Sequence, residues 1–384
     1  MLFDHEFERA RFVWGDESVS RLDDLLAADA RVMVVTGEHV GATPSVMDPV
    51  RAAIGERLVE TYTGARPNVP HETVTEGVSR LEASGADALV SVGGGSASDT
   101  AKAIAIFAGE ETDDLDQLRT HTVDGEVTVP DLPAAKVPLY CVVTTLSAAE
   151  VTNICGVSTP EEKVVLLDEK VRPQACLYDP TVAATTPDAV IASTGMNALD
   201  HAVEILYSEG RSDNPFYQAT AEKAIRLLTE NLPGAVSGDA DARVQTQLGA
   251  ALSGLGVVGG VSINHGVNHI LCARHPLSHG DGNSILLPHG VRFTAPEAPE
   301  AIRRIARAMG VDATGTDDEV VNAVVDAIAT LQETLGTPTR LRDVGVDRDD
   351  FEAVAAIAVG EPSLASSPRD ITEADIVSFL GAAW

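Results

Sequence analysis

Two short segments of this chain concentrate residues that could do chemistry. Residues 264–290, NHGVNHILCARHPLSHGDGNSILLPHG, hold five of the ten histidines. Within this segment His265 and His269 are four residues apart, so on a helix they would share one face. The segment GMNALDHAVE places Asn197 and His201 at the same spacing. Two helices that present imidazoles in this way predict a metal site or a site that transfers protons.

The other histidines of the first segment are less informative. Glycines and a proline interrupt the helical pattern before His279, so we expect that residue to return from a loop towards the same site. His275 and His289 fit equally well as ordinary surface or core residues. His269 also has an alternative interpretation, as a helix-face residue that packs beside His265.

A glycine-rich turn, VSVGGGSASDTAK, directly follows an apolar run. Its three consecutive glycines allow backbone amides to approach a pyrophosphate without interference from Cβ atoms. We expect a helix that begins at Ser96 to add its positive N-terminal end. Ser96 and Asp99 also form an S-x-x-D pattern, which caps helices of any function. The strand, turn and helix together predict a nucleotide-binding site.

The first half of the chain alternates short apolar runs with helical segments. The runs that predict buried parallel strands are RVMVVT (31–36), LVETYT (58–63), ALVSV (88–92) and PLYCVV (138–143). Residues 71–85 have helical periodicity up to Gly85, and a further helix is expected near residues 45–57. This alternation is typical of a doubly wound α/β sheet. Residues 110–135 are acidic and predict a loop or a short hairpin over the sheet.

The character of the sequence changes after YDPTVAATTP, residues 178–187. The remainder is rich in alanine and has long helical periodicities. We therefore place a boundary near Asp179 and Pro180. This divides the chain into an α/β nucleotide-binding domain, residues 1–179, and a helical domain that carries the metal or substrate site, residues 180–384.

Composition restricts the class of protein. The chain has 384 residues, with 58 acidic and 27 basic side chains, and a formal charge of −31. That charge argues against nucleic acid or an anionic membrane as partner. A dispersed acidic surface with few lysines is typical of adaptation to high salt. The four cysteines form no CxxC pair, the N-terminus lacks an apolar signal segment, and no apolar run is long enough to span a membrane. We therefore expect a cytoplasmic enzyme.

The motifs resemble those of one family. GGGSASDTAK resembles the GGGSxxDxAK signature of the iron-containing (group III) alcohol dehydrogenases, and TTLSAAEVT resembles their second nucleotide-contacting loop. GMNALDHAVE and the HGVNH…HG segment resemble their metal-binding helices. The four motifs follow the family order over about residues 10–300. The resemblance implies a Rossmann-like N-terminal domain and an all-helical C-terminal domain, an architecture that dehydroquinate synthase shares. It also implies a homodimer and a nicotinamide cofactor bound between the domains.

The resemblance assigns ten residues in three segments to this cofactor. They are Thr36 and Gly37; Gly93, Gly94, Gly95, Ser96 and Asp99; and Thr144, Thr145 and Ser147, with the two threonines on the nicotinamide side. NAD-preferring relatives often have an aspartate after the first threonine, where its charge repels a 2′-phosphate. Gly37 stands there instead and adds no cation, while Glu38 beside it restores some negative field. NAD and NADP therefore both remain open.

The metal-binding helix departs from the common pattern GMDALTHA. In metal-dependent members the ligands are one aspartate and three histidines, which match Asn197, His201, His265 and His279 here. A neutral amide oxygen is a weaker ligand than a carboxylate for Fe²⁺ or Zn²⁺. Asp200 is one residue from His201 and so about 100° around the helix, where it could act only from behind the ligands. Metal dependence therefore remains open.

Both this change and the shortened loop TTLSAAEVT resemble the maleylacetate reductase branch. That branch implies hydride transfer between NAD(P)H and a small oxo-dicarboxylate. Without a metal, the imidazoles of His201, His265 and His269 must polarise the substrate. His269 matches the family's proton relay and is our first choice for the general acid. The alternatives are a metal-dependent alcohol dehydrogenase that acts on simple alcohols, a lyase like dehydroquinate synthase, and a non-catalytic nucleotide-binding protein.

Overall fold

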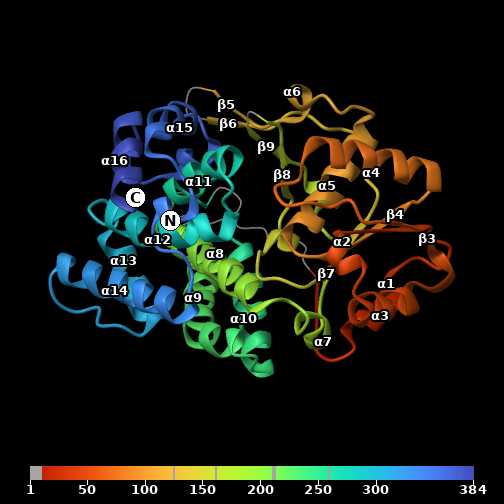
Figure 1. Ribbon diagram of the computed structural model, residues 1–384, viewed down its shortest axis with the longest axis horizontal. Coiled ribbons are helices and arrows are strands. Elements are labelled where there is room, and N and C mark those ends of the chain that lie inside the picture. The colour runs from red at the N-terminus through yellow and green to blue at the C-terminus, as the bar shows by residue number, and fades with distance from the viewer. Residues whose placement is uncertain (1–10, 124–125, 161, 210–212, 258–259) are drawn as a thin grey trace.

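The computed structural model describes residues 11–123, 126–160, 162–209, 213–257 and 260–384. Two halves lie side by side (Figure 1). The N-terminal half is built on a parallel sheet, and the C-terminal half consists of packed helices. This is the fold class that the sequence predicts, a Rossmann-like α/β domain followed by an all-α domain.

The large sheet has six strands in the order β1-β10-β7-β4-β2-β3, and every neighbouring pair is parallel. Its strands are β1 (Phe12–Trp14), β2 (Val32–Thr36), β3 (Leu58–Tyr62), β4 (Ala88–Gly93), β7 (Leu139–Val143) and β10 (Ala175–Tyr178). All residues of the four central strands are buried, as valine-rich runs covered by helices on both faces should be. The four predicted strands are β2, β3, β4 and β7.

Helices cover both faces of this sheet. The helices of this half are α1 (Leu22–Leu25), α2 (Glu38–Gly41), α3 (Pro44–Ile54), α4 (His71–Ser84), α5 (Gly95–Glu110) and α6 (Leu115–Leu118), with α7 (Pro180–Ala183) after the last strand. Helix α4 ends as predicted at Gly85, whose φ of 63° is left-handed. Helix α5 begins at Gly95 and not at Ser96, and Gly94 takes the N-cap position. The predicted S-x-x-D cap is therefore not formed, because Ser96 already lies within the helix.

Two antiparallel hairpins extend from the sheet. The acidic stretch forms α6 and then β5 (His121–Val123) and β6 (Glu126–Thr128), which agrees with the expected short hairpin, but β6 contacts residues Pro362–Ser366 of the helical half. A second hairpin, β8 (Ile154–Ser158) and β9 (Lys163–Leu167), was not expected. Strand β8 packs against α5, which places the hairpin next to the glycine turn.

The helical half surrounds one buried helix. Its members are α8 (Asp188–Tyr207), α9 (Pro215–Val236), α10 (Ala240–Gly254), α11 (Ile263–Arg274), α12 (His279–Thr294), α13 (Pro299–Met309), α14 (Asp317–Leu335), α15 (Phe351–Ala358) and α16 (Glu373–Ala383). Helix α8 packs against α9, α10, α12 and α13, and every residue from Gly195 to Tyr207 is buried. Polar residues on this stretch therefore need internal partners. None of the helices in the described part of the chain is long and apolar enough to cross a bilayer.

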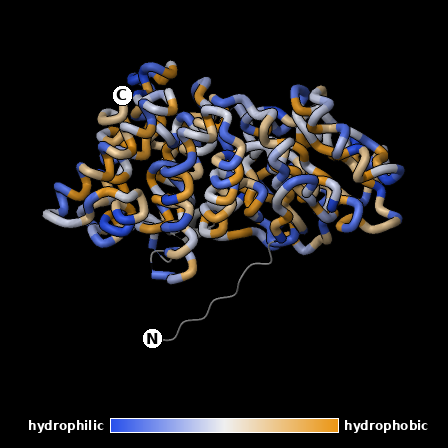
Figure 2. Tube along the Cα trace, turned by 90° about the horizontal axis from the view of Figure 1, so that it is seen from below, coloured by the Kyte–Doolittle hydropathy of each residue, from blue (hydrophilic) through white to orange (hydrophobic). Residues whose placement is uncertain are grey.

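Melting temperature is expected to rise with salt, because the formal charge of −31 makes the compact state repel itself. Figure 2 shows hydrophilic segments around the outside of both halves. Raising KCl from about 0.1 M to about 1 M shortens the Debye length from about 10 Å to about 3 Å. We expect the melting temperature to rise by roughly 5–10 °C, measured by circular dichroism. A parallel series in sucrose separates screening from solute exclusion, and a flat response to KCl would contradict the prediction.

Candidate active site

A cleft of ≈ 890 Å³ lies between the two halves. On the α/β side it is lined by these predicted cofactor residues: Gly37, Gly93, Gly94, Gly95, Ser96, Asp99, Thr145 and Ser147. On the helical side it is lined by Asn197, His201, His265, His269 and His279. The structure therefore brings the glycine turn and the histidine cluster to one cavity.

The glycine turn lies against the loop that follows β7. Gly93 has a φ of 147°, which a side chain would strain. A Cβ atom on Gly94 would lie 2.6 Å from Cγ2 of Thr145, and one on Gly95 would lie 3.0 Å from Oγ of Ser147. The backbone amides at the start of α5 thus reach the cleft without intervening side chains, as a pyrophosphate site requires.

Lys102, the lysine of GGGSASDTAK, joins this turn to the neighbouring loop. Its side chain is fully buried, and Nζ donates to the carbonyls of Ala149 (2.5 Å) and Ile154 (2.7 Å) and to Oγ1 of Thr152 (3.1 Å). Asp99 lies 3.4 Å from the same ammonium group. Asp99 is thus held by Lys102 and does not cap its helix.

Two of the predicted cofactor residues do not line the cleft. Thr36 is buried, and its hydroxyl donates to the carbonyl of Val92 at 2.8 Å. The carbonyl of Thr144 accepts from Oγ1 of Thr186 at 2.7 Å. Both residues sit at strand ends, where these hydrogen bonds hold the loops in place, and their assignment as cofactor contacts stays a prediction.

Lys163 lines the cleft and was not singled out from the sequence. It is half-buried on β9 and comes from the unexpected hairpin. Burial, and then the charge of Lys163, lower the pKa of His279 well below the ordinary range. A lysine in an acidic, lysine-poor chain was the available signal for this residue.

Three helices bring the imidazoles together. Helix α8 carries His201, α11 carries His265 and His269, and α12 begins with His279. The rings of His201 and His265 are stacked with centroids 4.7 Å apart, and those of His269 and His279 are stacked at 5.5 Å. His265 and His279 meet edge-on at 5.4 Å. His279 is the first residue of α12, so it does not return from a loop as the sequence suggested.

Glycines on α12 permit this close approach. A Cβ atom on Gly280 would lie 2.5 Å from the carbonyl oxygen of Ser193 on α8. Cβ atoms on Gly282 and Gly290 would overlap the side chains of Asn268 and Asn264 on α11. The glycines of HGDGNSILLPHG thus allow α12 to contact both neighbours and place His279 in the cluster.

Two buried carboxylates lie behind His265. Its Nδ1 donates to Glu204 Oε2 at 2.6 Å and lies 3.0 Å from Asp200 Oδ2. Burial disfavours the charged imidazole, but Glu204 and Asp200 outweigh it and raise the pKa of His265 to about 9. Burial and the neighbouring Glu204 raise the pKa of Asp200 to about 7. Nδ1 is thus held as a donor, and Nε2 is turned to the cleft. Glu204, one helical turn after His201, was missed.

Glu361 orients His269. Its Oε2 lies 3.1 Å from Nδ1 of the imidazole, so Nε2 is directed away from Glu361. Burial lowers the pKa of His269, although Glu361 opposes that shift. Outside the cleft, Nε2 of His275 lies 3.0 Å from Asp350, and His289 does not line the cavity either.

The predicted metal ligands do not form the set of acceptors that a divalent cation needs. Asn197 Oδ1 accepts from Nδ2 of Asn283 at 2.7 Å, and its own nitrogen faces His201 Nε2 at 3.4 Å. An amide nitrogen has no lone pair to offer a metal. As arranged, the site therefore does not fit a tightly bound cation.

The neighbouring side chains of Asp200, Glu204 and His265 do not supply a metal site in its place. Among the described residues, the one group of three His, Cys, Asp or Glu ligand atoms within 4.8 Å of one another is Asp200, Glu204 and His265. Ligands at about 2.1 Å from tetrahedral zinc lie roughly 3.4 Å apart. The 2.6 Å between Glu204 and His265 is a hydrogen-bond distance and leaves no such space.

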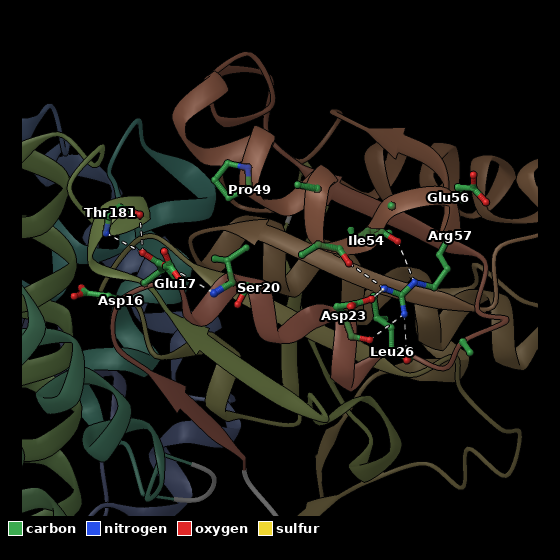
Figure 3. A pocket seen from close by; sticks show the side chains of 16 residues that line it. Asp16, Glu17, Ser20, Asp23, Leu26, Pro49, Ile54, Glu56, Arg57 and Thr181 are labelled. Atoms are coloured by element: carbon green, nitrogen blue, oxygen red, sulfur yellow. Dashed lines mark hydrogen bonds and ion pairs between the residues drawn. The ribbon is translucent and has the colours of Figure 1, made fainter.

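A second hollow, of ≈ 1120 Å³, lies beside α1 and α3 (Figure 3). Its guanidinium group, Arg57, donates to Asp23 Oδ1 at 2.6 Å and to the carbonyl of Ile54 at 3.0 Å. The described residues that line it include no histidine, cysteine or lysine. Because its cation is fully occupied within the protein, this hollow offers no comparable chemistry.

Comparisons with known proteins agree with this arrangement. Residues 10–180 match the family model "Iron-containing alcohol dehydrogenase", and residues 191–384 match "Fe-containing alcohol dehydrogenase family, C-terminal". Lactaldehyde reductase of Escherichia coli K12 is 37% identical over 84% of both chains. Maleylacetate reductase of Sphingobium indicum is 31% identical over 97% of this chain and 95% of its own.

Solved structures give the same result. A 1,3-propanediol oxidoreductase superposes with a TM-score of 0.89 at 29% identity, over 100% of both chains. Maleylacetate reductase from Agrobacterium tumefaciens superposes with a TM-score of 0.79 at 26% identity, over 100% of this chain and 98% of its own. The family uses nicotinamide dinucleotides and iron, the cofactors that the sequence led us to consider. The chain therefore belongs to the iron-containing alcohol dehydrogenase family and is an oxidoreductase.

Proposed function

We propose that this protein is an NAD(P)-dependent reductase of a small oxo-dicarboxylate, as maleylacetate reductases are. The observation that carries the proposal is the composition of the cleft. The helical side presents four imidazoles, and Lys163 of the β8–β9 hairpin adds its ammonium group to the same cleft, while Asn197 stands where metal-dependent relatives have a carboxylate. The positive charge of Lys163 favours an anionic substrate, and the imidazoles can serve as hydrogen-bond partners for it.

The residues of this chain then have distinct tasks. The amides of Gly94 and Gly95, at the N-terminus of α5, hold the pyrophosphate of the cofactor. A reduced nicotinamide bound there would supply a hydride to the substrate carbon. The alkoxide or enolate that develops takes a proton from Nε2 of His269, and Glu361 holds that ring in place. The products are the reduced substrate and NAD(P)⁺.

The second candidate is a reductase of small neutral aldehydes that depends on a metal. Lactaldehyde reductase has a higher identity to this chain than maleylacetate reductase, 37% against 31%. The propanediol oxidoreductase also superposes with a higher TM-score than the maleylacetate reductase, 0.89 against 0.79. These similarities favour a neutral substrate.

Lys163→Met separates the two candidates. Initial rates of NADH and NADPH oxidation at high KCl are measured with maleylacetate, lactaldehyde and 3-hydroxypropanal. We expect the wild type to prefer maleylacetate, and Lys163→Met to raise KM for maleylacetate by roughly 10- to 100-fold while the aldehydes change little, because a charged hydrogen bond is lost. Lys163→Arg keeps the charge and is the matched control. A preference for the aldehydes supports the second candidate, and an equal rise in KM for the cofactor assigns Lys163 to NAD(P)H.

The remaining expectations belong to the same proposal. A homodimer in the cytoplasm would act on a small molecule, with neither nucleic acid nor a membrane as partner. The net charge of −31 supports the exclusion of polyanions.

A further inference from the structure

Three buried asparagines form a chain of hydrogen bonds from α11 through α12 to α8. Nδ2 of Asn268 donates to the backbone carbonyl of His279 and to Oδ1 of Asn283, both at 2.8 Å. Nδ2 of Asn283 donates to Oδ1 of Asn197 at 2.7 Å and lies 2.9 Å from Nε2 of His265. Asn268 and Asn283 are 0% exposed and Asn197 is 4% exposed.

The direction of this chain is fixed at one end. A backbone carbonyl can only accept, so Asn268 must turn its nitrogen to His279. Asn268 then donates its second hydrogen to Asn283, which must accept it with Oδ1. The nitrogen of Asn283 consequently faces Asn197, which also accepts with Oδ1. Reversal of any one amide would place two donors or two acceptors face to face.

Gly282 and Cys272 enclose the same end of the chain. A Cβ atom on Gly282 of α12 would overlap the amide of Asn268. On its other side, the oxygen of Asn268 accepts from Sγ of Cys272 at 3.3 Å. The amide of Asn268 is therefore closely packed on both sides, and its direction is set by the carbonyl of His279.

The chain removes two of the four matched metal ligands. Asn197 directs its nitrogen to His201, so its oxygen is unavailable. His265 Nε2 faces an N–H group of Asn283. That N–H group occupies the position in front of Nε2 that a cation would need. As arranged, Nε2 is not free to bind a cation.

We propose that Asn268 and Asn283 are positioning residues whose hydrogen-bond direction keeps divalent cations out of the histidine cluster and presents N–H donors there. The identity of residue 197 alone does not decide this, because its orientation is imposed from the backbone of His279 through two other amides. This inference concerns the site of the proposed function. Because metal binding is measured without turnover, its result does not depend on whether the enzyme accepts maleylacetate.

Asn283→Asp tests the proposal without a change to any matched ligand. One oxygen of the introduced carboxylate accepts from Asn268, and the other accepts from Asn197, which must then turn its own oxygen to His201. The full-length protein is stripped with a chelator at high KCl and titrated with Co²⁺, whose visible absorption reports tetrahedral binding, and bound Zn²⁺ is measured by mass spectrometry. We expect Asn283→Asp to bind Co²⁺ about 10- to 100-fold more tightly than the wild type. Asn322→Asp, on the exposed face of α14, adds the same charge and is expected to leave binding unchanged.

A double variant distinguishes reorientation from direct binding by the new carboxylate. Asn283→Asp with Asn197→Ala lacks the oxygen that is turned to His201, and we expect it to return to wild-type affinity. Retained affinity in the double variant would overturn the proposal. A folded Asn283→Asp protein with no gain would overturn it too, as would a wild type that binds Co²⁺ equally well. If Asn283→Asp does not fold, Asn283→Ala takes its place, because it removes the N–H group that faces both Asn197 and His265; no gain in that variant overturns the proposal.

Discussion

His269→Ala is expected to lower kcat by about 10²- to 10⁴-fold, the usual contribution of a general acid or base. The affinity for NAD(P)H should change little, because the glycine turn lies on the opposite wall of the cleft. Steady-state rates give kcat, and quenching of protein fluorescence by NADH gives the affinity. His275→Ala, at the end of the same helix but outside the cleft, is the matched control. A kcat within a few-fold of wild type would remove His269 from the reaction.

The pH dependence of the two directions should differ in sign. Burial lowers the pKa of His269 below that of an ordinary histidine. Reduction needs the protonated imidazole, so its rate should fall as pH rises through the lowered pKa. Alcohol oxidation needs the neutral imidazole, so its rate should rise through the same pKa. Glu361→Gln removes the carboxylate that favours protonation and should move both inflections to lower pH.

Gly94→Val is expected to weaken NAD(P)H binding by about 100-fold or more, which corresponds to roughly 2.8 kcal/mol. A Cβ atom there would lie 2.6 Å from Thr145 even before the cofactor arrives, and further methyl groups would enter the space beside the α5 amides. Isothermal titration with NADH and NADPH measures the loss, and circular dichroism checks the fold.

A graded series shows which contact is responsible. Gly94→Ala should have an intermediate effect, and Thr145→Ala in the same protein should relieve part of it, because the clashing Cγ2 and Oγ1 atoms are gone. Gly381→Ala, whose new Cβ would meet no atom within 4 Å, controls for glycine replacement in a helix. Unchanged affinity in a folded Gly94→Val protein would show that the cofactor lies elsewhere.

Local patterns were sufficient for the parts of the fold that depend on local physics. Valine-rich runs predicted β2 and β4, because a strand buried on both faces needs apolar residues throughout. Left-handed Gly85 marked the end of α4. The i,i+4 spacing of Asn197 and His201 placed both on one face of α8, and both line the cleft.

Partners from distant segments could not be read from these patterns. Glu361 meets His269 across 92 residues, and Asn283 meets Asn197 across 86. Spacing gives the face of a helix but not the residue that approaches it. The orientation of an amide is even harder to predict from the sequence, because it depends on which atom of the neighbouring group can donate a hydrogen bond. Lys163 was missed because its hairpin is short and its lysine has no motif around it.

The supporting threonines illustrate the same limit within a recognised motif. Thr36 and Thr144 lie one residue from Gly37 and Thr145, which do line the cleft. At a strand end one residue decides which way a side chain points. The resemblance named loops that line the cleft, while the choice of side chains that face the cleft depended on geometry that only the structure supplies.

Helix α12 has consequences for the order in which the protein acquires its reactivity. Its 16 residues include Gly280, Gly282 and Gly290 as well as an internal proline at position 288. Glycine costs about 1 kcal/mol and proline about 3 kcal/mol relative to alanine in a helix, so this segment has little tendency to form a helix on its own. It gains its structure from contact with α8 and α11, and His279 is its first residue. In a nascent or partly folded chain the imidazoles of α8, α11 and α12 are therefore apart, and the histidine cluster forms only when these three helices pack together.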